Sequence, residues 1–213
     1  MTQIHVVTSD NKAPYKDQLE SYFRARHQVF VREKGWKKLD RPDEIEIDDY
    51  DNDHTIYLIA LDQDKVVGGQ RLYPTVLSHM ISEVFPYLAT RGIPQAFNVF
   101  EWTRYFVVKE RRTGRTDCRL MAAFQEFCLK EGIVEATAVV EMWWLPRWQQ
   151  AGFKVRPLAL PSLIEGQLCI AAAIEISSNS LNSVLRLAGL RDSGLVRRGK
   201  LTPVLDQVPY VAA

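Results

Sequence analysis

The chain joins a predicted strand to a predicted helix through residues 97–132, FNVFEWTRYFVVKERRTGRTDCRLMAAFQEFCLKEG. Residues 97–108 are rich in aromatic and β-branched side chains, as strands are. Residues 117–131 place apolar side chains at helical spacing, and Gly132 follows where such a helix ends. A strand that leads directly into an amphipathic helix indicates an α/β fold, in which the helix packs on the sheet.

Similar patterns continue on both sides of this unit. We expect further strands at residues 3–8, 55–61, 66–73, 135–140, 153–158 and 167–176. We expect helices at residues 15–31, 80–88, 142–151 and 181–190, an acid-rich loop over 37–53 and an irregular tail. Two helices would flank a mostly antiparallel sheet in a three-layer α/β/α sandwich. We find no internal repeat or linker, so we expect residues 1–213 to form a single domain.

Composition narrows the classes of protein that fit this chain. The 213 residues are 46% hydrophobic, and 27 basic side chains against 26 acidic ones leave a net charge of +1. The apolar fraction excludes a disordered protein, and the charge gives no case for nucleic acid or a membrane as partner. No apolar run approaches the roughly 20 residues that span a bilayer, and we see no secretory signal, so we expect a cytoplasmic location. The cysteines and histidines lack ligand spacing, so no metal is expected.

Charged residues interrupt apolar stretches in two predicted elements. Arg26 shares a helical face with Phe23 and Phe30, and both Glu101 and Arg104 lie within the aromatic strand. A buried charge is costly unless it is paired or binds a ligand. A structural Arg–Glu salt bridge is one interpretation. Their recurrence, together with the acidic loop, favours a polar pocket enclosed by aromatic side chains.

The basic turn, residues 109–116, has the pattern Arg111-x-x-Gly114-x-Thr116. This pattern fits a strand–turn–helix whose backbone amides point at a phosphate, although a solvated basic turn would look the same. It resembles the pyrophosphate loop of GNAT acyltransferases, which implies a donor that carries pantetheine. The residues that we expect to hold the phosphates or a carrier protein are Lys109, Arg111, Arg112, Gly114, Arg115 and Thr116.

Three tryptophans fall within residues 141–148, EMWWLPRW. Such bulky side chains wall a cavity or an interface, or they pack in a core. We expect at least one of the three to pack in the core. We expect Trp143 and Trp144, with Val139 and Met142, to form a short acyl pocket, because bulky aromatic walls shorten a channel.

Spaced residues across about positions 20 to 110 resemble the signature of the LuxI-type acyl-homoserine-lactone synthases. The residues that carry this resemblance are Arg26, Phe30, Trp36, Asp48, Asp51, Arg71, Phe85, Glu101 and Arg104. The tryptophan block resembles the branch of that family that uses short branched-chain or aryl acyl-CoA donors. The resemblance implies a GNAT-like sandwich whose central sheet splays into a V.

The resemblance also implies a two-part reaction. The α-amine of S-adenosylmethionine attacks an acyl thioester to form an amide. Its carboxylate then closes a lactone, a quorum-sensing signal, and expels methylthioadenosine. Acyl-CoA is the favoured donor, with a short or branched chain such as isovaleryl, and acyl carrier protein is the alternative. No cofactor is bound permanently.

Three residues are implied to be catalytic. Glu101 suits a general base that acts directly or through a water, and the backbone near Arg104 suits stabilisation of the oxyanion. Asp48 is the third, because its carboxylate suits the cationic groups of S-adenosylmethionine.

The implied binding site for S-adenosylmethionine is larger. Its residues are Arg26, Phe30, Trp36, Asp48, Asp51, Arg71, Arg104 and Phe106. Arg26 and Arg104 suit the carboxylate of this substrate, and Phe30 and Trp36 suit its adenine and sulfonium. Arg71 would instead hold the acidic loop if it paired with Asp48 or Asp51.

Two other functions compete with this hypothesis. An ordinary GNAT N-acyltransferase that acts on another amine would explain the basic turn but not the paired aspartates. A non-catalytic relic of the fold would bind a partner through its tryptophans, and it would not need Glu101 or Arg104.

Overall fold

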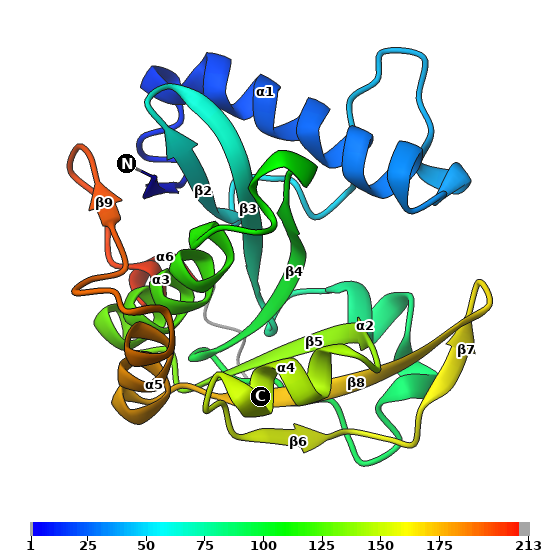
Figure 1. Cartoon of the computed structure of the whole chain (residues 1–213). Coiled ribbons are helices and arrows are strands. Elements are labelled where there is room, and N and C mark those ends of the chain that lie inside the picture. Colours follow the sequence, from blue (N-terminus) through cyan, green and yellow to red (C-terminus); the bar gives the residue numbers. More distant parts are fainter. Residues whose placement is uncertain (1, 209–213) are drawn as a thin grey trace.

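The computed structural model describes residues 2–208, and within them nine strands form one sheet (Figure 1). The strands are β1 (Gln3–Val7), β2 (Ile56–Asp62), β3 (Lys65–Pro74), β4 (Val99–Val107), β5 (Glu135–Glu141), β6 (Val155–Pro157), β7 (Ser162–Ile164), β8 (Gln167–Glu175) and β9 (Leu195–Arg197). Their order is β6-β8-β5-β4-β3-β2-β1-β9, with β7 paired to β8. The sheet is mostly antiparallel, as predicted. Its parallel pairs are β4 with β5 and β1 with β9.

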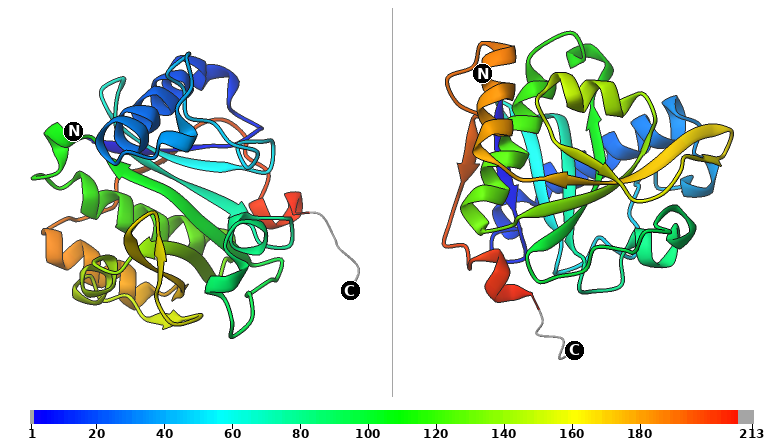
Figure 2. Two further views of the ribbon diagram at one scale, coloured as in Figure 1. Left: turned by 90° about the vertical axis from the view of Figure 1, so that its right-hand side faces the viewer. Right: turned by 90° about the horizontal axis from the view of Figure 1, so that it is seen from below.

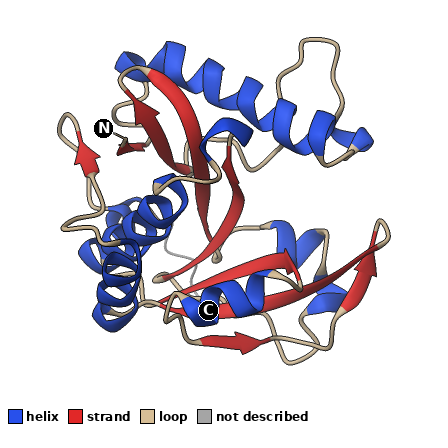
Figure 3. Ribbon diagram, in the orientation of Figure 1, coloured by secondary structure: helices blue, strands red, loops and turns tan. Residues whose placement is uncertain are grey.

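Helices cover both faces of this sheet (Figures 2 and 3). They are α1 (Lys16–Arg26), α2 (Met80–Glu83), α3 (Thr116–Glu131), α4 (Trp144–Gln150), α5 (Ser178–Ala188) and α6 (Val204–Gln207). On one face, Tyr22 of α1 packs in a buried cluster with Ile59 and Phe106. On the other face, Phe124 of α3 packs in a larger cluster with Trp102. The predicted three-layer sandwich is therefore confirmed.

The sheet splays between β4 and β5. These strands pair over Val99–Glu101 only, so they part beyond Glu101 (Figure 1). The divergence coincides with a register shift between β3 and β4, where Gly69 pairs with Phe106 but Arg71 pairs with Thr103. Arg104 lies at this bulge with a φ of 52°. A bulge bends its strand and increases the local twist, so it accounts for the V-shaped opening.

The predicted helices are found, with changes at their ends. Helix α1 stops at Arg26, and the chain continues as a π-helix, His27–Glu33, where the sequence predicts a helix to residue 31. Gly35 follows with a φ of 78°, a left-handed conformation that favours glycine. The helix predicted over 80–88 is two pieces, because Pro86 starts a separate 3-10 turn, Pro86–Leu88.

Three short elements were not predicted. Strands β7 and β9 span three residues each and α6 spans four, and β9 and α6 lie in the tail that we expected to be irregular. Segments this short carry too little periodicity to identify. The partner of β9 is also distant in sequence, because β9 pairs in parallel with β1 at the other end of the chain.

Candidate active site

A buried network of ion pairs lies where the acidic loop crosses the α1 face of β3 and β4. Arg26 is at its centre: Nε lies 2.5 Å from the Glu46 carboxylate, and Nη1 and Nη2 donate to Asp51 at 2.7 and 2.9 Å. Burial would raise the pKa of Asp51, but Arg26 and Arg71 hold it well below its usual range. Arg26 and Asp51 are therefore charged inside the protein, as a complementary pair.

Arg71 and Arg104 complete the network. Arg71 donates to both oxygens of Asp48, at 2.5 and 3.0 Å, and Arg104 donates to Asp48 at 2.7 Å. Arg104 Nε also lies 3.1 Å from the Glu46 carboxylate. Arg71 thus holds the acidic loop through Asp48, as one of our two interpretations of this residue expected. The Asp48 side chain is 18% exposed, whereas those of Arg26, Asp51 and Arg71 are fully buried.

Glu46 belongs to this network but was not predicted. It accepts hydrogen bonds from Arg26 and Arg104, and these two guanidinium groups lower its pKa despite its burial, which acts to raise it. In sequence it is one of several acids in the loop over residues 37–53. A count of charges could have indicated a further carboxylate, because three buried arginines need more carboxylate partners than Asp48 and Asp51 provide.

Glu101 is buried beside this network. Its carboxylate accepts hydrogen bonds from the backbone amides of Met80, at 3.1 Å, and Ile81, at 2.7 Å. Burial raises the pKa of Glu101, and these amides and His79 offset part of that shift. Because burial raises its pKa, the Glu101 carboxylate is a stronger base than an exposed one, and this suits it to accept a proton.

An aromatic wall stands next to Arg104. Phe30 and Trp36 stack with ring centroids 4.9 Å apart and an interplanar angle of 14°. Phe106 meets Phe30 edge to face at 6.1 Å, and the Arg104 guanidinium lies 5.8 Å from the Phe30 ring. The structure therefore brings together all eight residues that the sequence assigned to the binding of S-adenosylmethionine. Phe85 lies apart from them, packed against the cluster of Ile81 and Leu88.

The basic turn lies at the other end of β4, at the start of α3. Lys109, Arg112, Gly114 and Arg115 are exposed, whereas Thr116 is buried as the first residue of α3. Arg112 donates to Glu33 at 2.5 Å and to the Val107 carbonyl at 2.9 Å, and Arg111 pairs with Asp62.

These pairings leave part of the turn available to a ligand. The partners of Arg111 and Arg112 come from distant segments, which sequence spacing does not reveal. Among residues 109–116, Lys109 and Arg115 are exposed cations for which no ion pair is found in the described part of the chain.

The tryptophans divide between core and surface. Trp148 is buried and stacks near Trp102, which confirms that at least one of the three packs in the core. Trp143 is 51% exposed and stacks on Trp144 at 4.7 Å, and Trp144 meets Tyr105 edge to face at 5.0 Å.

The other two residues of the predicted acyl pocket lie elsewhere. Val139 packs against a different cluster, which includes Ile81 and Leu158, and the Met142 amide bonds the Leu168 carbonyl. The structure therefore stacks Trp143 and Trp144 into one wall just beyond the end of β5, whereas Val139 packs against another cluster.

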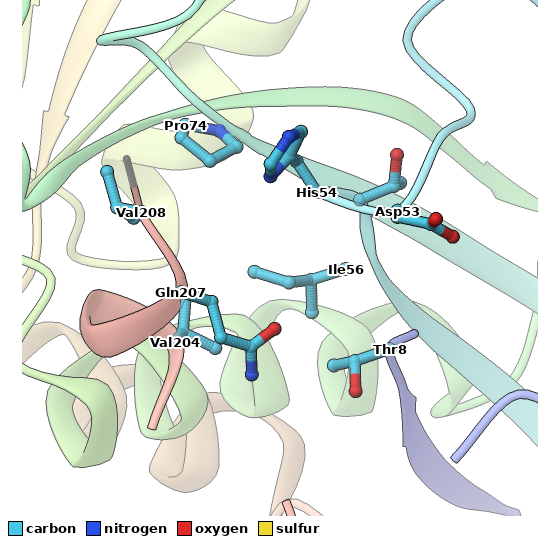
Figure 4. A pocket seen from close by; sticks show the side chains of 9 residues that line it. Thr8, Asp53, His54, Ile56, Pro74, Val204, Gln207 and Val208 are labelled. Atoms are coloured by element: carbon cyan, nitrogen blue, oxygen red, sulfur yellow. The ribbon is translucent and has the colours of Figure 1, made fainter. Parts of the chain in front are cut away.

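The pocket in Figure 4 is a different feature. It lies among Thr8, His54, Ile56 and Pro74 and encloses a cavity of about 10 Å³, room for about one water molecule. It is too small for a substrate. In the described residues, no cluster of three His, Cys, Asp or Glu side chains suits a metal ion, and no helix is long and apolar enough to cross a membrane.

Comparisons with known proteins identify the relatives of this chain. An isovaleryl-homoserine lactone synthase of Bradyrhizobium diazoefficiens is 50% identical over 180 residues, which cover 84% of this chain and 82% of that protein. The solved structure of a CoA-dependent acyl-homoserine lactone synthase, BjaI, with SAM and isopentyl-CoA is 44% identical. It superimposes with a TM-score of 0.94 over 97% of this chain and 98% of that chain.

More distant proteins share this fold. A protein of Lactobacillus plantarum described as an N-acetyltransferase matches with a TM-score of 0.57 over 82% of this chain and 99% of its own, at 18% identity. That likeness concerns the fold alone, and it confirms the GNAT-like architecture. The sequence model that describes the autoinducer synthases matches residues 10–184. The chain belongs to the autoinducer synthase family, the acyl-homoserine-lactone synthases.

Proposed function

We propose that this chain makes a short, branched acyl-homoserine lactone from S-adenosylmethionine (SAM) and an acyl-CoA, with isovaleryl-CoA as the favoured donor. One observation carries the proposal: a buried carboxyl group, a network of arginines and carboxylates, and an aromatic wall lie together where β4 separates from β5. The relative that is 50% identical is named for the isovaleryl product, and BjaI is described as CoA-dependent.

The first step is acyl transfer. The α-ammonium of SAM loses a proton toward Glu101, directly or through a water, and the free amine attacks the thioester carbonyl. A C–N bond forms, the C–S bond breaks, and coenzyme A leaves as a thiolate that takes up a proton. The raised pKa of Glu101 supports its role as the proton acceptor. Backbone amides of β4 near Arg104 and Phe106 would stabilise the oxyanion.

The second step closes the lactone. The SAM carboxylate attacks the γ-carbon next to the sulfonium, an O–C bond forms, and the C–S bond breaks. The leaving group is neutral methylthioadenosine, so the step needs no redox partner. A carboxylate and a γ-carbon within one bound molecule react in this way when the site holds them close together.

We assign SAM to the exposed edge of the network. Asp48 is its most exposed carboxylate, so it would contact the α-ammonium, and Arg104 would contact the SAM carboxylate. Arg26 is fully buried between Glu46 and Asp51. We therefore revise the expectation for Arg26 and assign it to positioning of the acidic loop. Phe30 and Trp36 would cover the adenine and the sulfonium.

The donor would lie in the opening between β4 and β5. Arg115, which precedes the first residue of α3, and Lys109, in the turn before it, would hold the CoA phosphates, because cations and helix N-termini favour phosphate. Trp143 and Trp144 would end the acyl pocket. An acyl carrier protein would use the same basic surface, and we place it second because BjaI, which is 44% identical, is described as CoA-dependent.

Mass spectrometry tests the proposal directly. The purified protein is incubated with SAM and a panel of acyl-CoAs from acetyl to dodecanoyl, with isovaleryl and aryl donors, and in parallel with acyl carrier proteins. We expect methylthioadenosine and isovaleryl-homoserine lactone in equal amounts. If a linear acyl-CoA were the best donor, the proposed preference for a branched acyl chain would be wrong. An acylated amine without methylthioadenosine would indicate an ordinary N-acyltransferase.

A further inference from the structure

Glu141, the last residue of β5, contacts groups from both sides of the opening between β4 and β5. Its Oε2 accepts a hydrogen bond from the Trp143 indole at 2.5 Å. Its Oε1 accepts one from Lys34 Nζ at 3.0 Å, across 107 residues of sequence. Lys34 Nζ in turn lies 5.5 Å from the centre of the Trp36 ring. One carboxylate therefore links the tryptophan wall to the aromatic wall.

The contacts on each side of Glu141 lead back to β4. Beyond Lys34, Trp36 stacks on Phe30, and Phe30 lies against the Arg104 guanidinium. Beyond Trp143, the Trp144 ring meets Tyr105.

Arg104 and Tyr105 are consecutive residues of β4, so these contacts form a closed circuit around the opening. Glu141 is the member of the circuit that joins its two halves.

The two ionic partners are only partly shielded from water, since the side chains of Lys34 and Glu141 are 34% and 20% exposed. An ion pair in this environment is weak, because water screens it. A donor that fills the opening would exclude this water, and the same pair would then attract more strongly. The strengthened ion pair would draw Lys34 toward β5, and Trp36 of the aromatic wall would move with it.

We infer that Glu141 is a positioning residue that couples the two substrates, so that a bound acyl-CoA tightens the binding of SAM. This inference rests on the proposed function, because it takes Trp36 as part of the SAM site and Trp143 as part of the donor site. Glu141 touches neither reacting centre. Its effect reaches SAM through Lys34 and Trp36, and it reaches the donor through Trp143.

Calorimetric titration of SAM, with and without isopentyl-CoA, measures this coupling. Isopentyl-CoA is a thioether and cannot donate an acyl group, so both substrates' sites fill without turnover. We expect the wild-type protein to bind SAM about fivefold more tightly with isopentyl-CoA present, at the lower end of coupling between two sites. In Glu141→Gln the amide oxygen can still accept from Trp143, but the side-chain NH2 that then faces Lys34 is uncharged overall and cannot accept a hydrogen bond. In this variant we expect isopentyl-CoA to change the Kd for SAM by no more than about 1.5-fold.

Three variants separate coupling from general damage. Lys34→Met should lose the coupling to the same extent, the double variant should lose no more, and Lys34→Arg should restore most of it. Glu175→Gln is the matched control, because Glu175 forms an exposed ion pair with Lys154 at 3.1 Å on the adjacent strand. It should leave the coupling at the wild-type value.

The outcomes distinguish this inference from the proposed function. Equal coupling in the wild type and Glu141→Gln, or a wild type that forms lactone but shows no coupling, would overturn the inference alone. A wild type that releases no methylthioadenosine with any acyl donor would overturn the proposed function, and the inference with it.

Discussion

Replacing Arg26 with methionine should destabilise the folded protein by about 3 kcal/mol at pH 7. Methionine fills a similar apolar volume, so the main effect is the loss of a buried charge with two carboxylate partners. Removal of one member of a buried ion pair costs about 3–5 kcal/mol, because its partner keeps an uncompensated charge. Here Asp51 keeps Arg71 at 3.0 Å and Glu46 keeps Arg104, so the lower end applies.

Urea denaturation followed by circular dichroism measures this loss of unfolding free energy. In a thermal melt of a chain of this size, about 3 kcal/mol corresponds to a fall of roughly 6–12 °C in Tm. The sign of the pH dependence is fixed by Asp51. Its pKa is lowered in the folded wild type, so its contribution to stability is present above the unfolded pKa of about 3.9 and is lost as pH falls through the folded value. The difference between Arg26→Met and the wild type should therefore narrow in acid.

The control is Arg24→Met on the same helix. Arg24 is exposed and pairs with Glu20 at 2.9 Å, one helical turn away. Such a pair contributes about 0.3–0.5 kcal/mol. If Arg26→Met were no less stable than Arg24→Met, the network would not be a charged, buried unit, and our explanation of the acidic loop would be wrong.

Three further predictions concern activity. Glu101→Gln should lower kcat at least about 100-fold with an unchanged circular dichroism spectrum, because a general base contributes about that much; the wild-type kcat should fall as pH drops through the raised pKa of Glu101, and a pH profile checks this. Trp143→Ala and Trp144→Ala should raise kcat/KM for hexanoyl-CoA relative to isovaleryl-CoA by about tenfold in at least one variant, since even one methylene in a hydrophobic pocket accounts for about tenfold or more. Replacing Lys109 and Arg115 with alanine should raise KM for acyl-CoA about tenfold in low salt and leave KM for SAM unchanged, which steady-state kinetics at two salt concentrations would show.

The sequence was most informative where a residue type conflicts with its neighbours. Arg26 on an apolar helical face and Glu101 and Arg104 in an aromatic strand were recognisable as site residues, because buried charges need partners. Glu46 was missed because an acid within an acid-rich loop conflicts with nothing. The pairing of Arg112 with Glu33 was equally hidden, since a surface ion pair across 79 residues leaves no local pattern.

The fold and the site depend on the same irregularity in β4. In a regular strand, residues three apart point to opposite faces, so Glu101 and Arg104 should lie on opposite sides of the sheet. The bulge changes this. The Thr103 hydroxyl accepts a hydrogen bond from Arg71, and the next side chain, Arg104, donates to Asp48 of the acidic loop. Two consecutive side chains thus serve the network.

Holding Arg104 at a φ of 52° costs about 1–2 kcal/mol. Without the bulge, however, its guanidinium would enter the apolar cluster of Trp102 and Phe124 without a carboxylate, and an unpaired buried charge costs more. The same extra residue makes Tyr105 face Trp144, and it accompanies the parting of β4 from β5. A Glu-x-x-Arg spacing in a strand is therefore compatible with one shared site only if the strand is bulged, and the bulge that aligns the charges also accounts for the opening that would admit the acyl donor.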